Sequence, residues 1–221
     1  MNMDKNEGRR RARLLAQEHR DHGDFMSWFE SLYAAADGDI NAIPWAEMTA
    51  NDKWVSWAES QKLDGKGKTA VVVGCGLGDD AEVLAARGFD VTAFDISESA
   101  VAWCKKRFPE SPVKYITADL FDLPETWKFD FVLEIFTIQA LPLEFRERAI
   151  RGVAHLVARG GTLLAIGRLV GDLDERVRMP WPMTRTELDG FARSSLRQIH
   201  FDDYMDGEDP PVRRFCAEYR R

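Results

Sequence analysis

The chain has 221 residues, which is enough for one domain with a full hydrophobic core. Hydrophobic residues make up 45% and charged residues 30%, so a disordered or fibrous chain is excluded. The net charge of −7 argues against a broad nucleic-acid surface, and no apolar run approaches the roughly 18 residues of a membrane span. We expect a cytoplasmic protein, monomeric or weakly homo-oligomeric, that binds neither nucleic acid nor membrane.

Residues 1–15 are basic but lack the apolar stretch of a secretory signal. The cysteines Cys75, Cys104 and Cys216 and the four histidines are scattered, so we expect neither a disulfide framework nor a metal site.

Three helices are expected before the first strand. The patterns that predict them cover residues 5–22, 25–36 and 51–62. We treat residues 1–62 as an N-terminal helical cap or lid, and residues 63–221 as a Rossmann-like core within one structural domain.

From residue 69 onward, apolar strands alternate with amphipathic helices. Strands are predicted at 69–74, 89–95, 113–119, 129–136 and 162–168, and helices at 79–88, 97–108, 142–161 and 184–196. Gly160-Gly161 is the predicted stop of the third of these helices. This alternation predicts an α/β fold with a doubly wound, mostly parallel sheet.

The last two predicted strands, 196–204 and 212–221, differ from the others because no helix separates them. Their connection, DGEDPP, is too short for a crossover helix. We therefore expect them to form an antiparallel pair at one edge of the sheet.

A glycine loop, Gly74-Cys75-Gly76-Leu77-Gly78, follows the first predicted strand. Glycines allow the backbone to approach a ligand closely, and ligands of such sheets bind beyond the carboxyl ends of the strands. Asp95 ends the second strand about 20 residues further on, where an acid binds ribose hydroxyls. These features predict a nucleotide or nucleoside site.

Two ligand classes compete for this loop. A dinucleotide would place its pyrophosphate at the helix N-terminus, beside the carboxylates of Asp79 and Asp80, where like charges repel. S-adenosylmethionine carries positive charge and no phosphate, so we interpret the two aspartates as favouring it. A nicotinamide-dependent oxidoreductase stays an alternative, as does a nucleoside-binding protein without catalytic activity.

Other polar residues end neighbouring strands. Asp119 ends the third strand and could accept a hydrogen bond from an adenine amino group, with Leu120 beside the ring. Glu134 ends the fourth strand, at the same edge of the sheet, where it would face the methionine part of the cofactor or the substrate.

The motif order GCGLGDDAEVLAARGF, FDIS, TADLF, FDFVLE and GGTLL resembles class I S-adenosylmethionine-dependent methyltransferases. Within these it is most similar to the thiopurine and thiol/halide methyltransferase group, through IPWAE (43–47), ALPLEFRERA (140–149) and MPWPMTRTEL (179–188). Val73 departs from the acid that many class I members carry before the glycine loop, and Glu134 stands where the group commonly has Asp.

The resemblance implies a cofactor, S-adenosylmethionine, and roles for individual residues. Arg146 and Trp181 would border the acceptor pocket, and Glu134 and Arg146 are the candidate catalytic residues. The implied cofactor-binding residues are Trp28, Trp45, Gly74, Gly76, Gly78, Asp95, Ile96, Asp119, Leu120, Glu134 and Ile135.

The candidate chemistry is methyl transfer to a small molecule. A thiol, with a pKa of about 8.5, is already partly ionised near neutral pH, whereas an alcohol needs a general base. No histidine falls at a strand end or in the motif loops, although Glu134 or Tyr33 could serve as a base. We therefore expect S-methylation of a thiol or another soft nucleophile, with O- or N-methylation as the alternative.

Overall fold

The computed structural model describes residues 5–176 and 179–221, so the first four residues of the basic N-terminal stretch lie outside the described residues. Its centre is a mixed sheet in the order β3-β2-β1-β4-β5-β8-β7, with β6 pairing β5 off this path. The strands are β1 (Thr69–Val73), β2 (Asp90–Asp95), β3 (Lys114–Thr117), β4 (Phe129–Ile135), β5 (Val157–Val170), β6 (Met183–Thr184), β7 (Arg197–Met205) and β8 (Arg213–Arg220).

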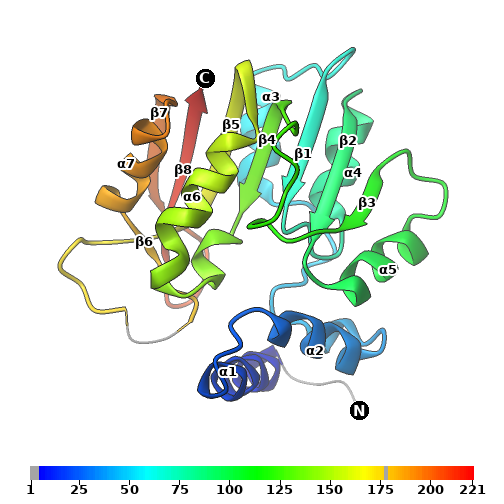
Figure 1. Cartoon of the computed structure of the whole chain (residues 1–221), viewed down its shortest axis with the longest axis vertical. Helices are drawn as coiled ribbons and strands as arrows, with labels where there is room; N and C mark the ends of the chain where they lie inside the picture. The colour runs from blue at the N-terminus through cyan, green and yellow to red at the C-terminus, as the bar shows by residue number, and fades with distance from the viewer. Residues whose placement is uncertain (1–4, 177–178) are drawn as a thin grey trace.

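The direction of the strands confirms the predicted fold class. Strands β1 to β5 run parallel to one another, while β8 runs antiparallel to both β5 and β7. In Figure 1 the arrow of β8 points up, so the carboxyl ends of β1 to β5 meet at the lower edge of the sheet.

Helices cover both faces of the sheet and its lower edge. In Figure 1, α6 and α7 lie in front of the sheet and α3 and α4 behind it, while α1 and α2 lie below. The helices are α1 (Lys5–Asp21), α2 (Ser27–Ala36), α3 (Asp52–Ser60), α4 (Asp79–Ala86), α5 (Glu98–Arg107), α6 (Arg146–His155) and α7 (Arg185–Arg193), with 3₁₀ turns η1 (Ile40–Ala42), η2 (Ile138–Ala140) and η3 (Leu143–Phe145).

Successive residues of the central strands pack on opposite faces, which is why these strands are apolar throughout. In β4, Val132 belongs to the apolar cluster that includes residues of α6 and α7. Its neighbours Phe131 and Leu133 belong to the cluster with Trp54 of α3 and Leu84 of α4.

The three N-terminal helices do not form one unit. Trp54 of α3 is fully buried with its ring centroid 6.3 Å from that of Phe131, so α3 packs on the sheet although the sequence analysis placed it in the cap. Helices α1 and α2 form a separate cluster that also includes Leu77 of the glycine loop and Trp181. We use "cap" below for α1, α2 and the segment 37–50.

The prediction of one helix over residues 142–161 is wrong at its end. Helix α6 ends at His155, and β5 begins at Val157. Gly160 and Gly161 serve the strand instead, because a Cβ on Gly161 would lie 2.9 Å from the Phe129 carbonyl oxygen of β4. The close approach coincides with a register shift between β4 and β5 at Phe129 and Phe131.

In the described part of the chain, none of the helices is long and apolar enough to cross a bilayer.

Candidate functional site

The glycine loop connects β1 to α4 at the lower edge of the sheet. Gly74, Gly76 and Gly78 all have positive φ, of +61°, +52° and +90°. A Cβ on Gly74 would lie 2.4 Å from Thr137 Oγ1, so the loop passes close to the turn that follows β4. A Cβ on Gly76 would lie 3.3 Å from the Tyr33 hydroxyl, so this part of the loop faces the cap.

Asp95 holds the middle of the loop. One carboxylate oxygen accepts the Gly76 N–H at 2.9 Å, and the other accepts the Ser97 N–H at 3.0 Å. Burial raises the pKa of Asp95 to about 6. Among the described residues no cation pairs with it, so donors from a ligand would stabilise its charged form.

The interpretation that Asp79 and Asp80 favour a cationic ligand is wrong, because both carboxylates are bound to other parts of the protein. Arg107 of α5 binds both oxygens of Asp79, each at 2.8 Å, and so neutralises that charge. Asp80 accepts the Asn51 N–H at 2.8 Å, and burial raises its pKa to about 6. The two carboxylates join the loop to its neighbours, so they give no preference for a cationic ligand.

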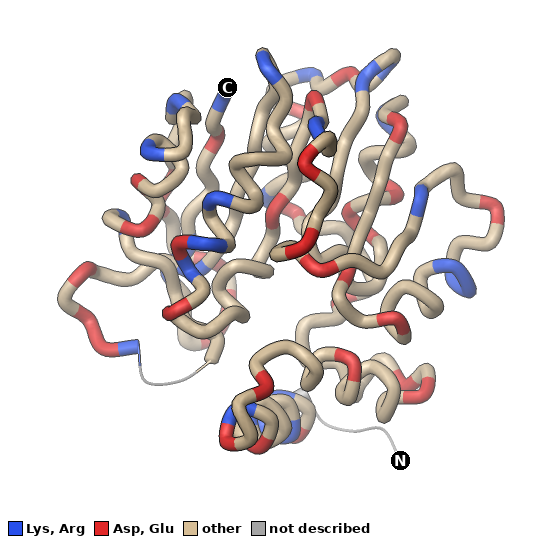
Figure 2. The backbone as a smooth tube through the Cα atoms, viewed as in Figure 1, with Lys and Arg blue, Asp and Glu red and all other residues tan. Residues whose placement is uncertain are grey.

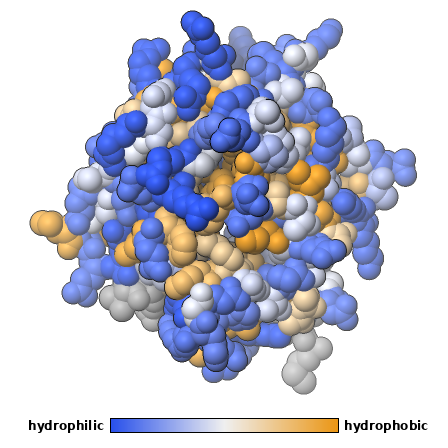
Figure 3. All heavy atoms as spheres, viewed as in Figure 1, coloured by the Kyte–Doolittle hydropathy of each residue, from blue (hydrophilic) through white to orange (hydrophobic). Residues whose placement is uncertain are grey.

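The cap places aromatic side chains over the glycine loop. Trp28 and Tyr33 are buried, and Trp45, which is 41% exposed, donates its indole N–H to the Tyr33 hydroxyl at 2.8 Å. Trp28 and Trp45 meet edge to face with centroids 6.1 Å apart. In Figure 3 apolar residues gather at the centre of the molecule, above the cap. The cap thus covers the carboxyl ends of the strands with an apolar layer.

One carboxylate fastens the cap to the core. Glu30 of α2 accepts the Ser97 hydroxyl at 2.7 Å, the Ser99 N–H at 3.0 Å and the Ser99 hydroxyl at 2.6 Å. These donors lie at the N-terminal end of α5, directly after Asp95. The cap and the predicted ribose-binding acid are therefore joined through one short segment.

The predicted adenine-binding residues lie in the two turns after β2 and β3. Ile96 is half-buried directly after Asp95. Asp119 accepts the Phe121 N–H at 2.8 Å with one oxygen, so it closes its own turn. The Leu120 side chain lies within contact distance of the position that a Cβ on Gly152 of α6 would take.

Glu134 is turned into the protein. It is 1% exposed, and a single oxygen accepts the N–H groups of Thr137 and Ile138, both at 2.9 Å. Burial raises the pKa of Glu134 to about 7. Its contacts support the turn after β4, next to half-buried Ile135, and so position the backbone beside the glycine loop.

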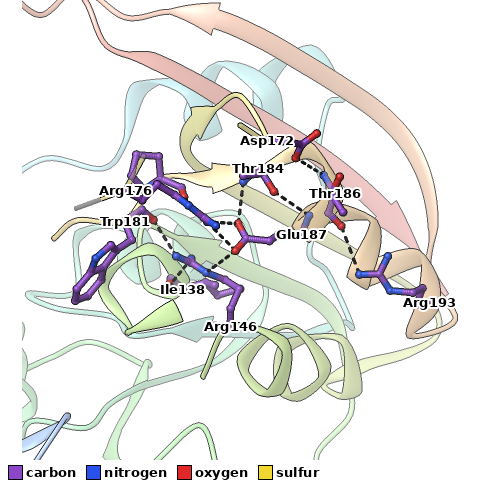
Figure 4. A network of polar contacts seen from close by, with 10 residues as sticks. Ile138, Arg146, Asp172, Arg176, Trp181, Thr184, Thr186, Glu187 and Arg193 are labelled. Atoms are coloured by element: carbon purple, nitrogen blue, oxygen red, sulfur yellow. Dashed lines mark hydrogen bonds and ion pairs between the residues drawn. The ribbon is translucent and has the colours of Figure 1, made fainter. Parts of the chain in front are cut away.

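Arg146 is the centre of a buried polar network (Figure 4). It donates to the carbonyl oxygens of Ile138, at 2.8 Å, and Trp181, at 2.9 Å, and its Nε lies 3.6 Å from Glu187. Arg176 binds Glu187 as well, at 2.7 Å. The Trp181 indole points away from this network. Arg146 therefore holds the walls of the predicted acceptor side together.

Comparison with known proteins finds a methyltransferase domain within the chain. Residues 70–161 match the sequence model of a family described as "Methyltransferase domain". A stretch of 127 residues, 56% of this chain, is 28% identical to thiocyanate methyltransferase 1 from Arabidopsis thaliana. The chain contains a class I S-adenosylmethionine-dependent methyltransferase domain.

The plant relative matches part of this chain in sequence, whereas the solved structures match it in fold. The chain spans about half of the plant protein, 55% of its length. Magnesium protoporphyrin IX methyltransferase from Synechocystis PCC 6803, solved with bound S-adenosylmethionine, has a TM-score of 0.62 at 20% identity over 77% of each chain. The [4+2]-cyclase SpnF has a TM-score of 0.70 at 15% identity, over 87% of this chain and 93% of its own. These two likenesses show the fold of the methyltransferase domain, and a fold alone does not fix the reaction.

The residues present fit S-adenosylmethionine. The buried carboxylate of Asp95 has no cationic partner among the described residues, and ribose hydroxyls would supply donors to it. At Gly76 the absence of a side chain keeps the gap between the glycine loop and Tyr33 open, because a Cβ there would lie 3.3 Å from the Tyr33 hydroxyl. Asp95 and the glycine loop would then supply an acid and a close backbone approach to this cofactor.

Three residues of the site carry roles that the sequence did not reveal. Glu30, Thr137 and Gln139 connect segments that are far apart in the chain, as in the bond from Thr137 Oγ1 to the Val73 carbonyl oxygen at 2.9 Å. No local motif marks such pairs. For Tyr33 a signal existed, because its helix carries an aromatic face.

Proposed function

We propose that the chain methylates the sulfur of a small thiol, or another soft nucleophile, with S-adenosylmethionine as methyl donor. When bound, S-adenosylmethionine supplies an electrophilic methyl group on a sulfonium. The protein's part is then alignment of the acceptor and exclusion of water.

The observation that carries the choice of sulfur is the state of the two groups that could act as a general base. Burial raises the pKa of Tyr33 well above its usual value, so its hydroxyl stays protonated at neutral pH. Glu134 is 1% exposed and turned into the protein, with one oxygen directed at two backbone N–H groups, so it is not open to an acceptor. An alcohol acceptor would need a free base, whereas a thiol with a pKa of about 8.5 does not.

We also propose a role for each of the predicted cofactor-binding residues. Asp95 would bind the ribose hydroxyls, Ile96 would pack on the adenine, and Asp119 and Leu120 would lie at its edge. Gly74, Gly76 and Gly78 would pass beneath the methionine part, near Ile135. Trp28 and Trp45 would close over the cofactor from the cap.

Support for a small acceptor comes from the cap. Its aromatic side chains and the three bonds of Glu30 hold it against the lower edge of the sheet. A layer of this kind excludes water during methyl transfer and leaves little room for a macromolecular acceptor. We therefore propose that the cap is a lid, with Arg146 and Trp181 beside the acceptor.

The test is transfer of tritium from S-adenosylmethionine labelled in its methyl group to a panel of small thiols, phenols and amines. We expect labelled thioethers as the main products. Labelled phenol ethers or methylamines with unlabelled thiols would overturn the choice of sulfur. Calorimetric titration with S-adenosylmethionine and NAD checks the cofactor independently, and tight NAD binding alone would overturn the whole proposal.

A further inference from the structure

Arg168 stands near the carboxyl end of β5 and lacks a partner for its guanidinium group. Its backbone N–H donates to Gln139 Oε1 at 2.7 Å, but the side chain makes no hydrogen bond or ion pair with residues 7–176 and 179–221, whose side chains the structure describes. The residue is nonetheless half-buried. The guanidinium nitrogens of Arg168 are not among the buried polar atoms without a partner, so they stay accessible and can bind an anion from outside the chain.

The position of Arg168 is close to the predicted methyl donor. Ile166 belongs to the apolar cluster on the α3 side of the sheet, so Arg168, two residues further on, lies on the same face. Strands β1, β4 and β5 are neighbours in the sheet. Arg168 is separated from β1 by two strand spacings of about 4.8 Å and lies three residues beyond the level of Val73, at about 3.3 Å per residue, so its backbone is roughly 14 Å from the end of β1. The extended side chain of Arg168 and a small acceptor can span that distance together.

The surroundings of Arg168 are cationic. Its direct partner in the register of β8 is Arg214, and burial together with the charges of Arg214 and Arg9 lowers the pKa of Arg168. Two carboxylates lie nearby, but Arg214 binds both, with Nε to Asp206 and Nη2 to Glu208 at 2.5 Å. Three guanidinium groups and two carboxylates leave one positive charge in excess.

One of these arginines belongs to the cap. Helix α1 carries Arg9, and it also runs beside the acceptor side, since Arg13 donates to the Met179 carbonyl oxygen at 3.3 Å and Arg20 lies 5.1 Å from the Trp181 ring centroid. The excess positive charge therefore lies where the cap meets the ends of β5 and β8.

We propose that Arg168 binds a carboxylate on the methyl acceptor, so that the acceptor is a small thiol with a permanent negative charge at its far end. The proposal rests on the function proposed above. A planar guanidinium can bind both oxygens of a carboxylate, which fixes the orientation of the acceptor as well as its charge. The thiol is then directed toward the glycine loop.

The test compares three short thiols: 3-mercaptopropionate, 3-mercapto-1-propanol and cysteamine, which are anionic, neutral and cationic. We expect the protein to prefer the anionic thiol. Arg168→Gln should raise the KM for 3-mercaptopropionate by roughly 10-fold or more, as expected for a lost bond between charged groups. The KM for 3-mercapto-1-propanol should stay within about twofold, because that thiol forms no such bond.

Two further variants serve as controls. Arg159→Gln removes an exposed arginine from the opposite end of the same strand and should leave all three KM values unchanged. Arg168→Lys keeps the charge and should recover part of the preference. Unchanged affinity of each variant for S-adenosylhomocysteine shows that the fold is intact.

Calorimetric titration of 3-mercaptopropionate into the protein saturated with S-adenosylhomocysteine separates the two proposals. Binding that Arg168→Gln abolishes supports the carboxylate site even if no thiol is methylated, and that result would overturn only the proposed function. Methylation of all three thiols with equal efficiency, together with identical behaviour of Arg168→Gln and Arg159→Gln, would overturn the carboxylate site alone.

Discussion

The two halves of the candidate site are built on opposite charges. On the cofactor half, the carboxylates of Asp95 and Glu30 accept hydrogen bonds from the loop and the start of α5. On the acceptor half, Arg146, Arg168 and Arg214 gather near the ends of β4, β5 and β8. Figure 2 shows the same difference within the cap: α2 carries acidic residues (red) and no basic ones, while α1 carries both acidic and basic (blue) residues.

The two halves also differ in the sequence separation of the residues that form their contacts. Asp95 and Gly76 lie 19 residues apart within one strand–helix–strand unit, so a local motif specifies their contact. Arg146 and Trp181 lie 35 residues apart and meet only after the sheet is assembled. Four variants test this contrast, and the change that we expect decreases from Arg146 to Glu30.

Arg146→Met tests whether the acceptor half depends on its buried arginine. The substitution removes donors to Ile138 and Trp181 and leaves Glu187 with only Arg176. Removing one partner of a buried charge network lowers the free energy of unfolding by about 3–5 kcal/mol. Urea unfolding measures it. Arg151→Met, an exposed position on the same helix, is the control, and equal loss in both variants would contradict the account.

Glu134→Gln tests the turn that joins the halves. Burial raises the pKa of Glu134 from 4.5 to about 7, so the folded protein keeps a proton that the unfolded chain releases between these values. Stability therefore falls as the pH rises through that window, by up to about 1.4 kcal/mol per pH unit from this group. Glutamine still accepts both N–H groups and has no proton to release.

We therefore expect urea unfolding of Glu134→Gln to depend less on pH between 4.5 and 7 than unfolding of the wild type. Asp80 and Asp95, whose pKa values burial raises to about 6, keep part of the slope. Exposed Glu144→Gln is the matched control. Identical slopes in all three proteins would show that Glu134 ionises normally in the folded state.

Asp95→Ala tests the cofactor half. Loss of a charge-assisted hydrogen bond weakens binding by about 1.5–3 kcal/mol, roughly 10- to 100-fold in Kd for S-adenosylmethionine. In the wild type the affinity should also fall below pH 6, as Asp95 takes up a proton. Calorimetry measures both effects. Asp90→Ala, exposed at the other end of β2, should bind normally, and normal binding by Asp95→Ala would remove it from the site.

Glu30→Gln tests the attachment of the cap. The amide keeps one oxygen acceptor where the carboxylate had two, so we expect about 1 kcal/mol less stability for the closed cap. Hydrogen exchange of the α2 amides should accelerate by roughly fivefold, with little change in the sheet. Exposed Glu47→Gln in the same cap is the control. Equal exchange in both variants would show that Glu30 does not hold the cap.

The strands and the glycine loop could be predicted because their signals are local. The β-branched run before Gly74 and the acid at Asp95 fall within one repeating unit. The end of α6 could not be predicted, because a Gly-Gly pair is a common signal for the end of a helix. Only the close approach of Gly161 to Phe129 shows that β5 needs these glycines. The charges of Asp79 and Asp80 were misinterpreted for the same reason, because their partners are distant in the sequence.

Asp79 and Asp80 illustrate the limit of reading charges from the sequence. Their partners, Arg107 and the Asn51 N–H, lie 28 and 29 residues away, so the sequence showed two free carboxylates where the structure has two satisfied ones. Arg168 is the reverse case. No motif marks Arg168 in the sequence, and its guanidinium has no partner among residues 7–176 and 179–221.

The most direct test of the two-half site is a crystal structure with S-adenosylhomocysteine and 3-mercaptopropionate bound together. We predict ribose hydroxyls on Asp95, the carboxylate of the thiol on Arg168, and the thiol sulfur between them, beside the glycine loop. A nucleoside bound away from Asp95, or a thiol whose carboxylate points away from Arg168, would contradict it.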